Sequence, residues 1–223
     1  MTRVIVAAPK FDFCMTSVIL SGGGSYTRDM ATTTAIEGPR ERVVLAAARL
    51  LRTRGYTGTS LRDIVKAADA PWGSLQHYFP GGKDQIVVEA MTAGTSQVDQ
   101  MIDDAFGRGR GAEAAVRAFF VTAAEVVEKR EFEAGCPVAL VALEYAGGED
   151  EIARNSRASI DGWIERFAGY LRADGIESRV ARRLGTAIIT QYEGALILSR
   201  IGHDAAPLRN AGNVMRQLVA DAR

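Results

Sequence analysis

Apolar residues recur every three or four positions through most of the chain, which is the spacing that places them on one face of an α-helix. This pattern predicts helices at Pro39–Arg54, Leu61–Ala68, Trp72–Tyr78, Lys83–Phe106, Gly111–Arg130, Pro137–Ala146, Glu151–Ala173, Arg179–Ile201 and Ala206–Ala222. No convincing run alternates apolar and polar residues as a half-buried strand does. The expected fold class is therefore all-α.

The stretch from Thr59 to Lys83 is the most informative part, because it combines two short helices with a tight turn. Ser60 is a good N-cap for the first helix. Pro71 disfavours helical geometry in the residue before it, and it can serve as the first residue of the next helix. Two helices of about two turns, joined by about three residues, match a helix-turn-helix, whose second helix lies in the major groove of DNA.

The second of these helices, Trp72–Tyr78, carries side chains suited to contacting DNA. Gly73 and Ser74 are small and allow a close approach to base edges. The larger residues offer stacking surfaces and hydrogen-bonding groups; they are Trp72, Gln76, His77 and Tyr78. Leu75 and Phe79, four apart, would anchor the helix to its own core. The same residues also fit an ordinary pair of amphipathic helices in which Trp72 and Tyr78 are simply packed.

From Arg40 to about Ala90 the chain resembles the DNA-binding domain of the TetR family of transcriptional repressors. The matching motifs are Leu50-Leu51-x-x-x-Gly55-Tyr56, Thr59-Ser60-Leu61-x-Asp63-Ile64 and Gly73-Ser74-Leu75-x-x-Tyr78-Phe79. Ala70-Pro71-x-Gly73-Ser74-Leu75 and Phe79-Pro80-Gly81-Gly82-Lys83 most resemble the LmrA/YxaF-like branch. The chain departs from the family pattern at Asp69, where Gly is usual in the turn, and at Gln76, where Tyr is usual.

Lys83 opens the next predicted helix, where free backbone amides favour a phosphate. Together with the residues at the start of the first motif helix, the predicted DNA-binding residues are Thr59, Ser60, Trp72, Gly73, Ser74, Gln76, His77, Tyr78 and Lys83. The expected nucleic-acid partner is double-stranded operator DNA.

Charge is distributed unevenly along the 223 residues, although the formal net charge is zero. Eight Lys or Arg and five Asp or Glu lie between Ile36 and Ile86, which gives this segment +3. A basic segment on an acidic remainder suits a protein that presents one end to phosphates. The expected domains are a disordered arm or extension at residues 1–35, the helix-turn-helix domain at 36–84, and a helical effector-binding and dimerisation domain at 85–223.

Residues 1–35 have three interpretations: a mostly disordered arm, an extension preceding translation that begins at Met30, and a DNA-touching arm whose Arg3, Lys10 and Arg28 are sparse. A signal peptide is not expected, because Lys10 and the glycines after Ser21 interrupt the apolar stretch. Two distant cysteines, Cys14 and Cys136, suit a reducing cytoplasm, and no run is apolar enough to span a membrane.

The C-terminal helices predict a dimer and an internal pocket. The last two long helices are apolar on more than one face, so one side is expected to meet a second copy, as in TetR-like repressors. Aromatic and other residues of the remaining body helices are predicted to line a small-molecule pocket; they are Phe119, Phe120, Cys136, Leu140, Tyr145, Trp163, Phe167, Tyr170, Gln191 and Tyr192. Plain core packing is the alternative for each of them, and Cys136 is interpreted as a small buried hydrophobe.

The predicted function is a transcriptional regulator, a repressor that a small apolar effector releases from its operator. Activation instead of repression stays open. The alternative is a helical protein-interaction module with a degenerate DNA-binding head. Catalytic and metal motifs are missing, and the two histidines, His77 and His203, are not at metal-ligand spacing. We therefore expect neither an enzyme nor a cofactor or metal.

Overall fold

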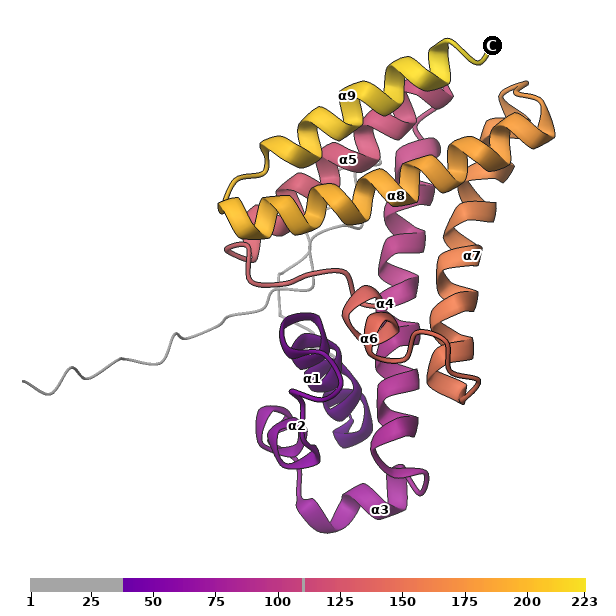
Figure 1. The fold of residues 1–223 in the computed structure, drawn as a ribbon. Coiled ribbons are helices and arrows are strands. Elements are labelled where there is room, and N and C mark those ends of the chain that lie inside the picture. The colour runs from indigo at the N-terminus through magenta and orange to yellow at the C-terminus, as the bar shows by residue number, and fades with distance from the viewer. Residues whose placement is uncertain (1–37, 110) are drawn as a thin grey trace, which may run out of the picture. The chain divides into compact units, whose positions relative to one another are not determined.

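The computed structural model describes residues 38–109 and 111–223, so the interpretations of residues 1–35 lie outside the described part. The elements are α1 (Pro39–Arg54), α2 (Leu61–Ala68), the 3₁₀ turn η1 (Trp72–Ser74), α3 (Leu75–Tyr78), α4 (Gly82–Phe106), α5 (Ala112–Lys129), α6 (Ala139–Glu144), α7 (Glu151–Ala173), α8 (Ser178–Gly202) and α9 (Ala206–Ala220). The described residues contain no strand, and the all-α prediction is confirmed (Figure 1).

The helix α2 is closed at both ends by local hydrogen bonds. Ser60 and Asp63 form a capping box, in which each side chain accepts from the backbone amide of the other residue. At the other end Asp69 adopts a left-handed conformation with φ of 46°, which Asp tolerates better than most residues. Arg42 of α1 donates from Nε to the Ala68 carbonyl at 3.1 Å. The turn therefore forms without the glycine that is usual there.

The second helix of the motif is not one continuous α-helix as predicted. It begins as the 3₁₀ turn η1, and only Leu75–Tyr78 are α-helical. Both the amide and the hydroxyl of Ser74 donate to the Pro71 carbonyl, at 3.1 and 2.7 Å. Such i to i+3 bonds tighten the first turn. Leu75 and Phe79 are buried, which confirms their predicted anchoring role.

The long helix α4 belongs to both the N-terminal helices and the body, since it packs against α1, α5 and α7 (Figure 1). Gly94, near the middle of this helix, marks a close approach to another segment. A Cβ atom at this position would overlap the ring of Pro137, which precedes α6. Gly94 is buried between Pro137 and the guanidinium of Arg52. The glycine is needed because a side chain would separate α4 from this segment.

The body has an aromatic core shared by α5, α7 and α8. The Phe119 ring makes edge contacts with the rings of Phe120 and Phe167, with centroids 5.5 and 5.1 Å apart, and lies 5.2 Å from Tyr192. Trp163 is fully buried, and its indole nitrogen donates to the Thr95 carbonyl of α4. This core fixes α4 against the body.

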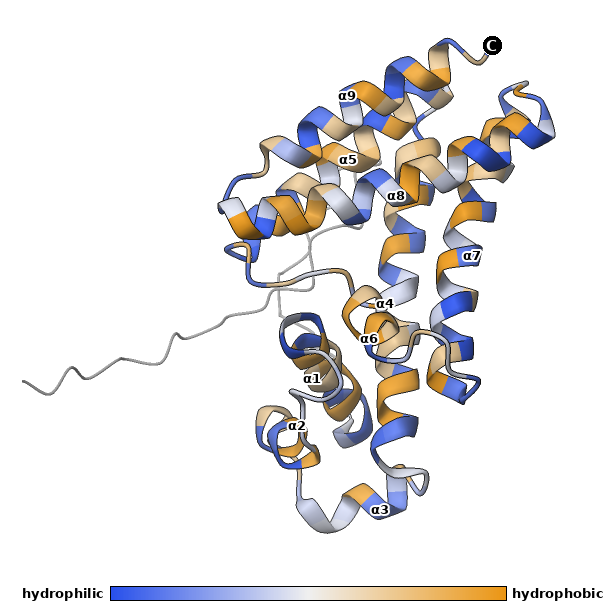
Figure 2. Cartoon of the chain, viewed as in Figure 1, coloured by the Kyte–Doolittle hydropathy of each residue, from blue (hydrophilic) through white to orange (hydrophobic). Residues whose placement is uncertain are grey.

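The pair α8 and α9 leaves a set of large apolar side chains exposed. They are Ile197, Leu198, Ile201, Val214 and Leu218. Figure 2 shows hydrophobic residues along both helices. Exposed apolar groups that gather on one face mark an interaction surface. Among the described helices, none has the length and apolar character needed to cross a bilayer.

Replacing Gly94 tests the close approach of α4 to Pro137. We expect Gly94→Ala to lower the free energy of unfolding by about 1–3 kcal/mol, because the added methyl group forces neighbouring atoms apart. Helix propensity alone predicts a gain of about 1 kcal/mol. Gly162→Ala on α7 is the matched control, because nothing lies near its Cβ position. Urea unfolding measures both; a stabilised Gly94→Ala variant would contradict the packing argument.

Candidate nucleic-acid interface

The second helix of the motif presents an exposed face made of its predicted DNA-binding residues. Trp72 is 55% exposed, and Gly73, Gln76 and His77 are exposed as well. Ser74 and Tyr78 are half-buried. Within the described residues the side chains of Gln76 and His77 have no hydrogen-bond partner, although the two rings of His77 and Tyr78 touch. This face can therefore offer stacking surface and free polar groups to a ligand.

Thr59 and Ser60, which precede α2, make hydrogen bonds within the fold. Thr59 is fully buried, and its hydroxyl donates to the Gly55 carbonyl at 2.7 Å. Because the Thr59 side chain is not on the surface, the prediction that it contacts DNA is corrected to a structural role in the turn before α2. Ser60 is exposed, but its hydroxyl both donates to and accepts from Asp63. The hydrogen bonds that the Ser60 hydroxyl and amide donate to the Asp63 carboxylate hold the pKa of Asp63 below its usual value.

Lys83 does not project freely from the start of α4. Its Nζ donates to the Tyr56 carbonyl at 2.8 Å and lies 3.6 Å from the centre of the Tyr56 ring. Burial lowers the pKa of Lys83. The nearby amides of Gly81 and Gly82 already donate to Gln85 and Phe79. The expectation of free amides is therefore wrong for these two, and Lys83 retains two of its three N–H donors.

Tyr56 joins the turn after α1 to α4 and α6. Its hydroxyl donates to Asp84 of α4 at 2.5 Å, and its ring meets the Tyr145 ring edge-on at 5.0 Å. Its backbone amide and that of Thr57 donate to the Glu144 carboxylate at 2.7 and 2.8 Å. We call these two hydrogen bonds the Glu144 clasp. They connect α6 directly to the turn that leads into α2.

The Glu144 clasp favours the charged form of the carboxylate. Burial by itself raises the pKa of Glu144, but the hydrogen bonds from Thr57 and Tyr56 and the charge of Lys83 outweigh it, so the pKa is lowered. Sequence reasoning missed this contact, because Glu144 lies 88 residues from Tyr56 and no local spacing indicates the pair.

The predicted pocket residues do not gather around one cavity. Phe119, Phe120, Trp163, Phe167 and Tyr192 are buried in the aromatic core. Cys136 is buried, as predicted, and its sulfur accepts from the amides of Val138 and Ala139. Tyr170 donates to Asp103 and stacks on Phe106. Gln191 is exposed on α8, so the structure does not place it inside the body.

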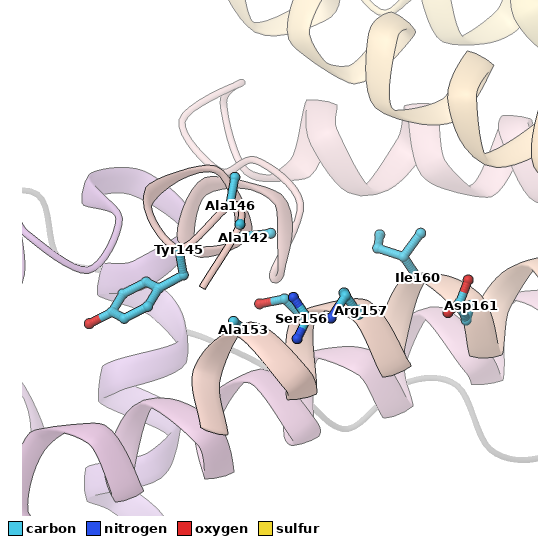
Figure 3. Close-up of a pocket in the computed structure, with 9 residues that line it drawn as sticks. Ala142, Tyr145, Ala146, Ala153, Ser156, Arg157, Ile160 and Asp161 are labelled. Carbon is cyan, nitrogen blue, oxygen red and sulfur yellow. The ribbon is translucent and has the colours of Figure 1, made fainter. Parts of the chain in front are cut away.

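Tyr145 and Leu140 each line a surface groove. Tyr145 borders a groove of about 440 Å³ between α6 and α7, which we call the α6–α7 groove; it is lined by Ala142, Tyr145, Ala146, Gly147, Ala153, Ser156, Arg157, Ile160 and Asp161. Figure 3 shows Ala142 of α6 and, just after this helix, Tyr145 and Ala146 opposite the α7 residues, with the Tyr145 ring directed away from Ile160 and Asp161. Since Tyr145 also touches Tyr56, this groove adjoins the Glu144 clasp.

A buried carboxyl group lies in the body on α8. Burial raises the pKa of Glu193 to about 7, and a hydrogen bond with Cys136 opposes this shift. Its Oε1 atom is buried without a hydrogen-bond partner in the described residues. None of the ion pairs found among the described residues includes Glu193. Across the same residues, no group of three or more His, Cys, Asp or Glu is arranged to hold a metal ion.

The chain combines a helix-turn-helix head with a helical body, which is the architecture of a DNA-binding regulator. Residues 43–90 match the bacterial regulatory proteins of the tetR family, and residues 112–214 match the C-terminal domain of LmrA/YxaF-like transcriptional regulators. The chain therefore belongs to the TetR family of transcriptional regulators, and its body is of the LmrA/YxaF type. Its matching families and relatives are transcriptional regulators, not enzymes.

Curated relatives match over most of their length. An uncharacterised HTH-type transcriptional regulator of Mycobacterium tuberculosis is 34% identical over 82% of this chain and 95% of its own. The uncharacterised HTH-type transcriptional regulator YxaF of Bacillus subtilis is 32% identical, covering 76% and 88%. The HTH-type transcriptional regulator LmrA of the same species is 28% identical, covering 81% and 96%.

Solved structures agree with this assignment. A TetR regulatory protein from Rhodobacter sphaeroides superposes with a TM-score of 0.72 at 25% identity, over 81% of this chain and 98% of that one. A TetR transcriptional regulator from Chloroflexus aurantiacus gives 0.70 at 29% identity, over 82% and 94%. TetR-family regulators bind operator DNA as dimers, so the expected class of nucleic-acid partner is confirmed.

Glu144→Ala tests the Glu144 clasp. We expect faster hydrogen exchange at the amides of Tyr56 and Thr57, because both lose their acceptor. The free energy of unfolding should fall by about 1–2 kcal/mol. This range is smaller than that of buried charged hydrogen bonds, because Glu144 is exposed and solvent screens its charge. Glu149→Ala, an exposed glutamate in the turn after α6, is the control. Unchanged protection at both amides would refute the clasp.

Proposed function

We propose that this regulator is a repressor, which binds a near-palindromic operator as a dimer and leaves it when a small apolar effector binds the body. The observation that carries the proposal is the exposed face of Trp72–Tyr78, where Trp72 is 55% exposed on a helix anchored by buried Leu75 and Phe79. A packed, folded head argues against the alternative of a degenerate head. Operator binding also implies a cytoplasmic location.

The exposed apolar side chains of α8 and α9 support a dimer through these two helices. Ile197, Leu198 and Ile201 lie on α8, and Val214 and Leu218 lie on α9. Burying such groups against a second copy is favourable, at about 25 cal/mol for each Å² of apolar surface. A dimer also gives two recognition helices, which must reach half-sites about 34–36 Å apart or a multiple of that distance.

The α6–α7 groove is the proposed place for an apolar effector. Its walls include Ala142, Ala146 and Ile160, and its edge at Tyr145 adjoins the Glu144 clasp. An effector that moves α6 would weaken the hold on Tyr56 and Thr57 and change the position of the DNA-binding head. Such an effector must bind the DNA-incompetent conformation more tightly, because a ligand indifferent to the two states shifts nothing.

Selection of genomic fragments by the purified protein tests the proposal as a whole. We expect recovery of fragments that share one near-palindromic site. Their position relative to promoters distinguishes repression from activation, and the adjacent genes indicate the class of effector. Binding without sequence preference, or binding insensitive to salt, would instead favour the protein-interaction module.

Gln76→Ala tests base contact by the exposed helix. We expect the variant to relax the preference at one position in each half-site, which corresponds to about 1–3 kcal/mol of discrimination. Gln76 is exposed and has no partner in the described residues, so the fold should be unaffected. Binding to the operator and to single-base variants measures the effect. A variant with wild-type preference at every position would show that Gln76 reads no base.

Lys83→Met tests phosphate contact at the start of α4. We expect weaker binding to all DNA sequences and a salt slope reduced by about one unit, because one phosphate contact is lost. The change also frees the Tyr56 carbonyl, so thermal unfolding must be measured in parallel. Lys129→Met, at an exposed lysine of the body, is the control. An unchanged salt slope would leave Lys83 with its structural contact to Tyr56 alone.

A further inference from the structure

The peptide group that joins Tyr56 to Thr57 has a charged partner at each end. Its carbonyl oxygen accepts a hydrogen bond from Nζ of Lys83 at 2.8 Å. Its N–H donates to Oε2 of Glu144, also at 2.8 Å. The positive end of the peptide dipole therefore faces the carboxylate, and the negative end faces the ammonium group.

This peptide is the hydrogen-bonded link between the two charges. None of the ion pairs found among residues 38–109 and 111–223 joins Lys83 to Glu144. Hydrogen bonds that share one polarised group strengthen each other. Loss of the carboxylate should therefore weaken the hold of the Tyr56 carbonyl on Lys83, although the two side chains form no ion pair.

The end of α1 is built to admit the carboxylate. Gly55 has a φ of 66°, which favours glycine. A Cβ atom at this position would overlap Oε1 of Glu144. That oxygen accepts from the Tyr56 amide at 2.7 Å, so the same turn engages both carboxylate oxygens. The backbone of the turn, and not Glu144 alone, therefore specifies the contact.

The two charges stabilise each other. Burial lowers the pKa of Lys83, and the charges of Asp84 and Glu144 oppose this shift. In return, the charge of Lys83 is among the causes that lower the pKa of Glu144 against the effect of burial. Glu144 is the last residue of α6 in the body, whereas Lys83 lies in the first turn of α4. A carboxylate of the body therefore acts on a cation of the DNA-binding head.

We propose that Glu144 positions Lys83 for contact with a DNA phosphate. The Tyr56 carbonyl fixes one N–H of the ammonium group and leaves two for the phosphate. The body would thereby control a contact that lies outside the recognition helix. This inference rests on the proposed function, which gives Lys83 its phosphate contact. Movement of α6 would accordingly change the affinity for DNA of any sequence, while the preference among bases stays the same.

Glu144→Gln tests this role, because charge alone predicts the opposite result. Removing an acidic group beside a DNA-binding face lowers repulsion and strengthens binding. We expect binding about three- to tenfold weaker instead, both to an operator fragment and to an unrelated duplex of equal length. The salt slope should fall between those of the wild type and of Lys83→Met. In the Lys83→Met background, Glu144→Gln should cause no further loss.

Two further variants and one measurement on the free protein separate position from charge. Glu144→Asp keeps the charge but withdraws it from the turn, so it should also weaken binding. Glu149→Gln, at an exposed glutamate after α6, removes a charge elsewhere and should not weaken binding. NMR titration of the Lys83 side chain should show a lower pKa in Glu144→Gln, because an opposing charge is lost. Each variant is compared well below its unfolding midpoint.

Unchanged or tighter DNA binding by Glu144→Gln and Glu144→Asp overturns the proposal, and so does an equal loss in the wild-type and Lys83→Met backgrounds. A loss confined to the operator fragment also overturns it, because that result points to base contacts instead.

The unrelated duplex separates these outcomes from failure of the repressor itself. A loss that requires Lys83, in a protein that selects no operator, supports the positioning role and contradicts the repressor. If Lys83→Met leaves the salt slope unchanged, Lys83 makes no phosphate contact, and the positioning role of Glu144 is overturned with it.

Discussion

The position of the DNA-binding head depends on a carboxylate that holds two backbone amides. Glu144 accepts from Tyr56 and Thr57 in the turn between α1 and α2. These amides follow the C-cap of α1 at Gly55. Tyr56 extends the same junction to α4 through Asp84 and Lys83. One small cluster therefore sets the relation of α1, α4 and α6.

A second, apolar junction supports the first. Gly94 lets α4 approach Pro137 at the start of the α6 segment, and Arg52 reaches across to donate to Gln97 at 2.6 Å. The segment between α5 and α6 is thus held by both α1 and α4, since its Gly135 amide donates to the Arg52 carbonyl. The proposed effector, if it displaced α6, would act on the head through both junctions at once.

Local patterns predicted the helices well, and long-range contacts account for what they missed. Pro39, Gly55, Ser60 and Asp150 mark helix ends through short-range chemistry, so the bounds of α1 and α7 are those that the spacing predicts. Which polar residue is buried depends on distant elements instead. For that reason Thr59 was predicted to contact DNA although it is buried, and Gln191 was predicted to line a pocket although it is exposed. The contact of Glu144 with the turn after α1 gave no local signal either.

The strength of the Glu144 clasp suits a switch. Two charge-assisted hydrogen bonds on an exposed carboxylate stabilise one head position by about 1–2 kcal/mol after allowance for solvent screening. Allosteric coupling energies span about the same range. A much stronger junction, such as a buried ion pair, would require an effector with a correspondingly larger preference for the released state. Without the carboxylate, only the packing of α4 at Gly94 would hold the head. The held and released head positions would then differ little in free energy, so an effector would have little to change.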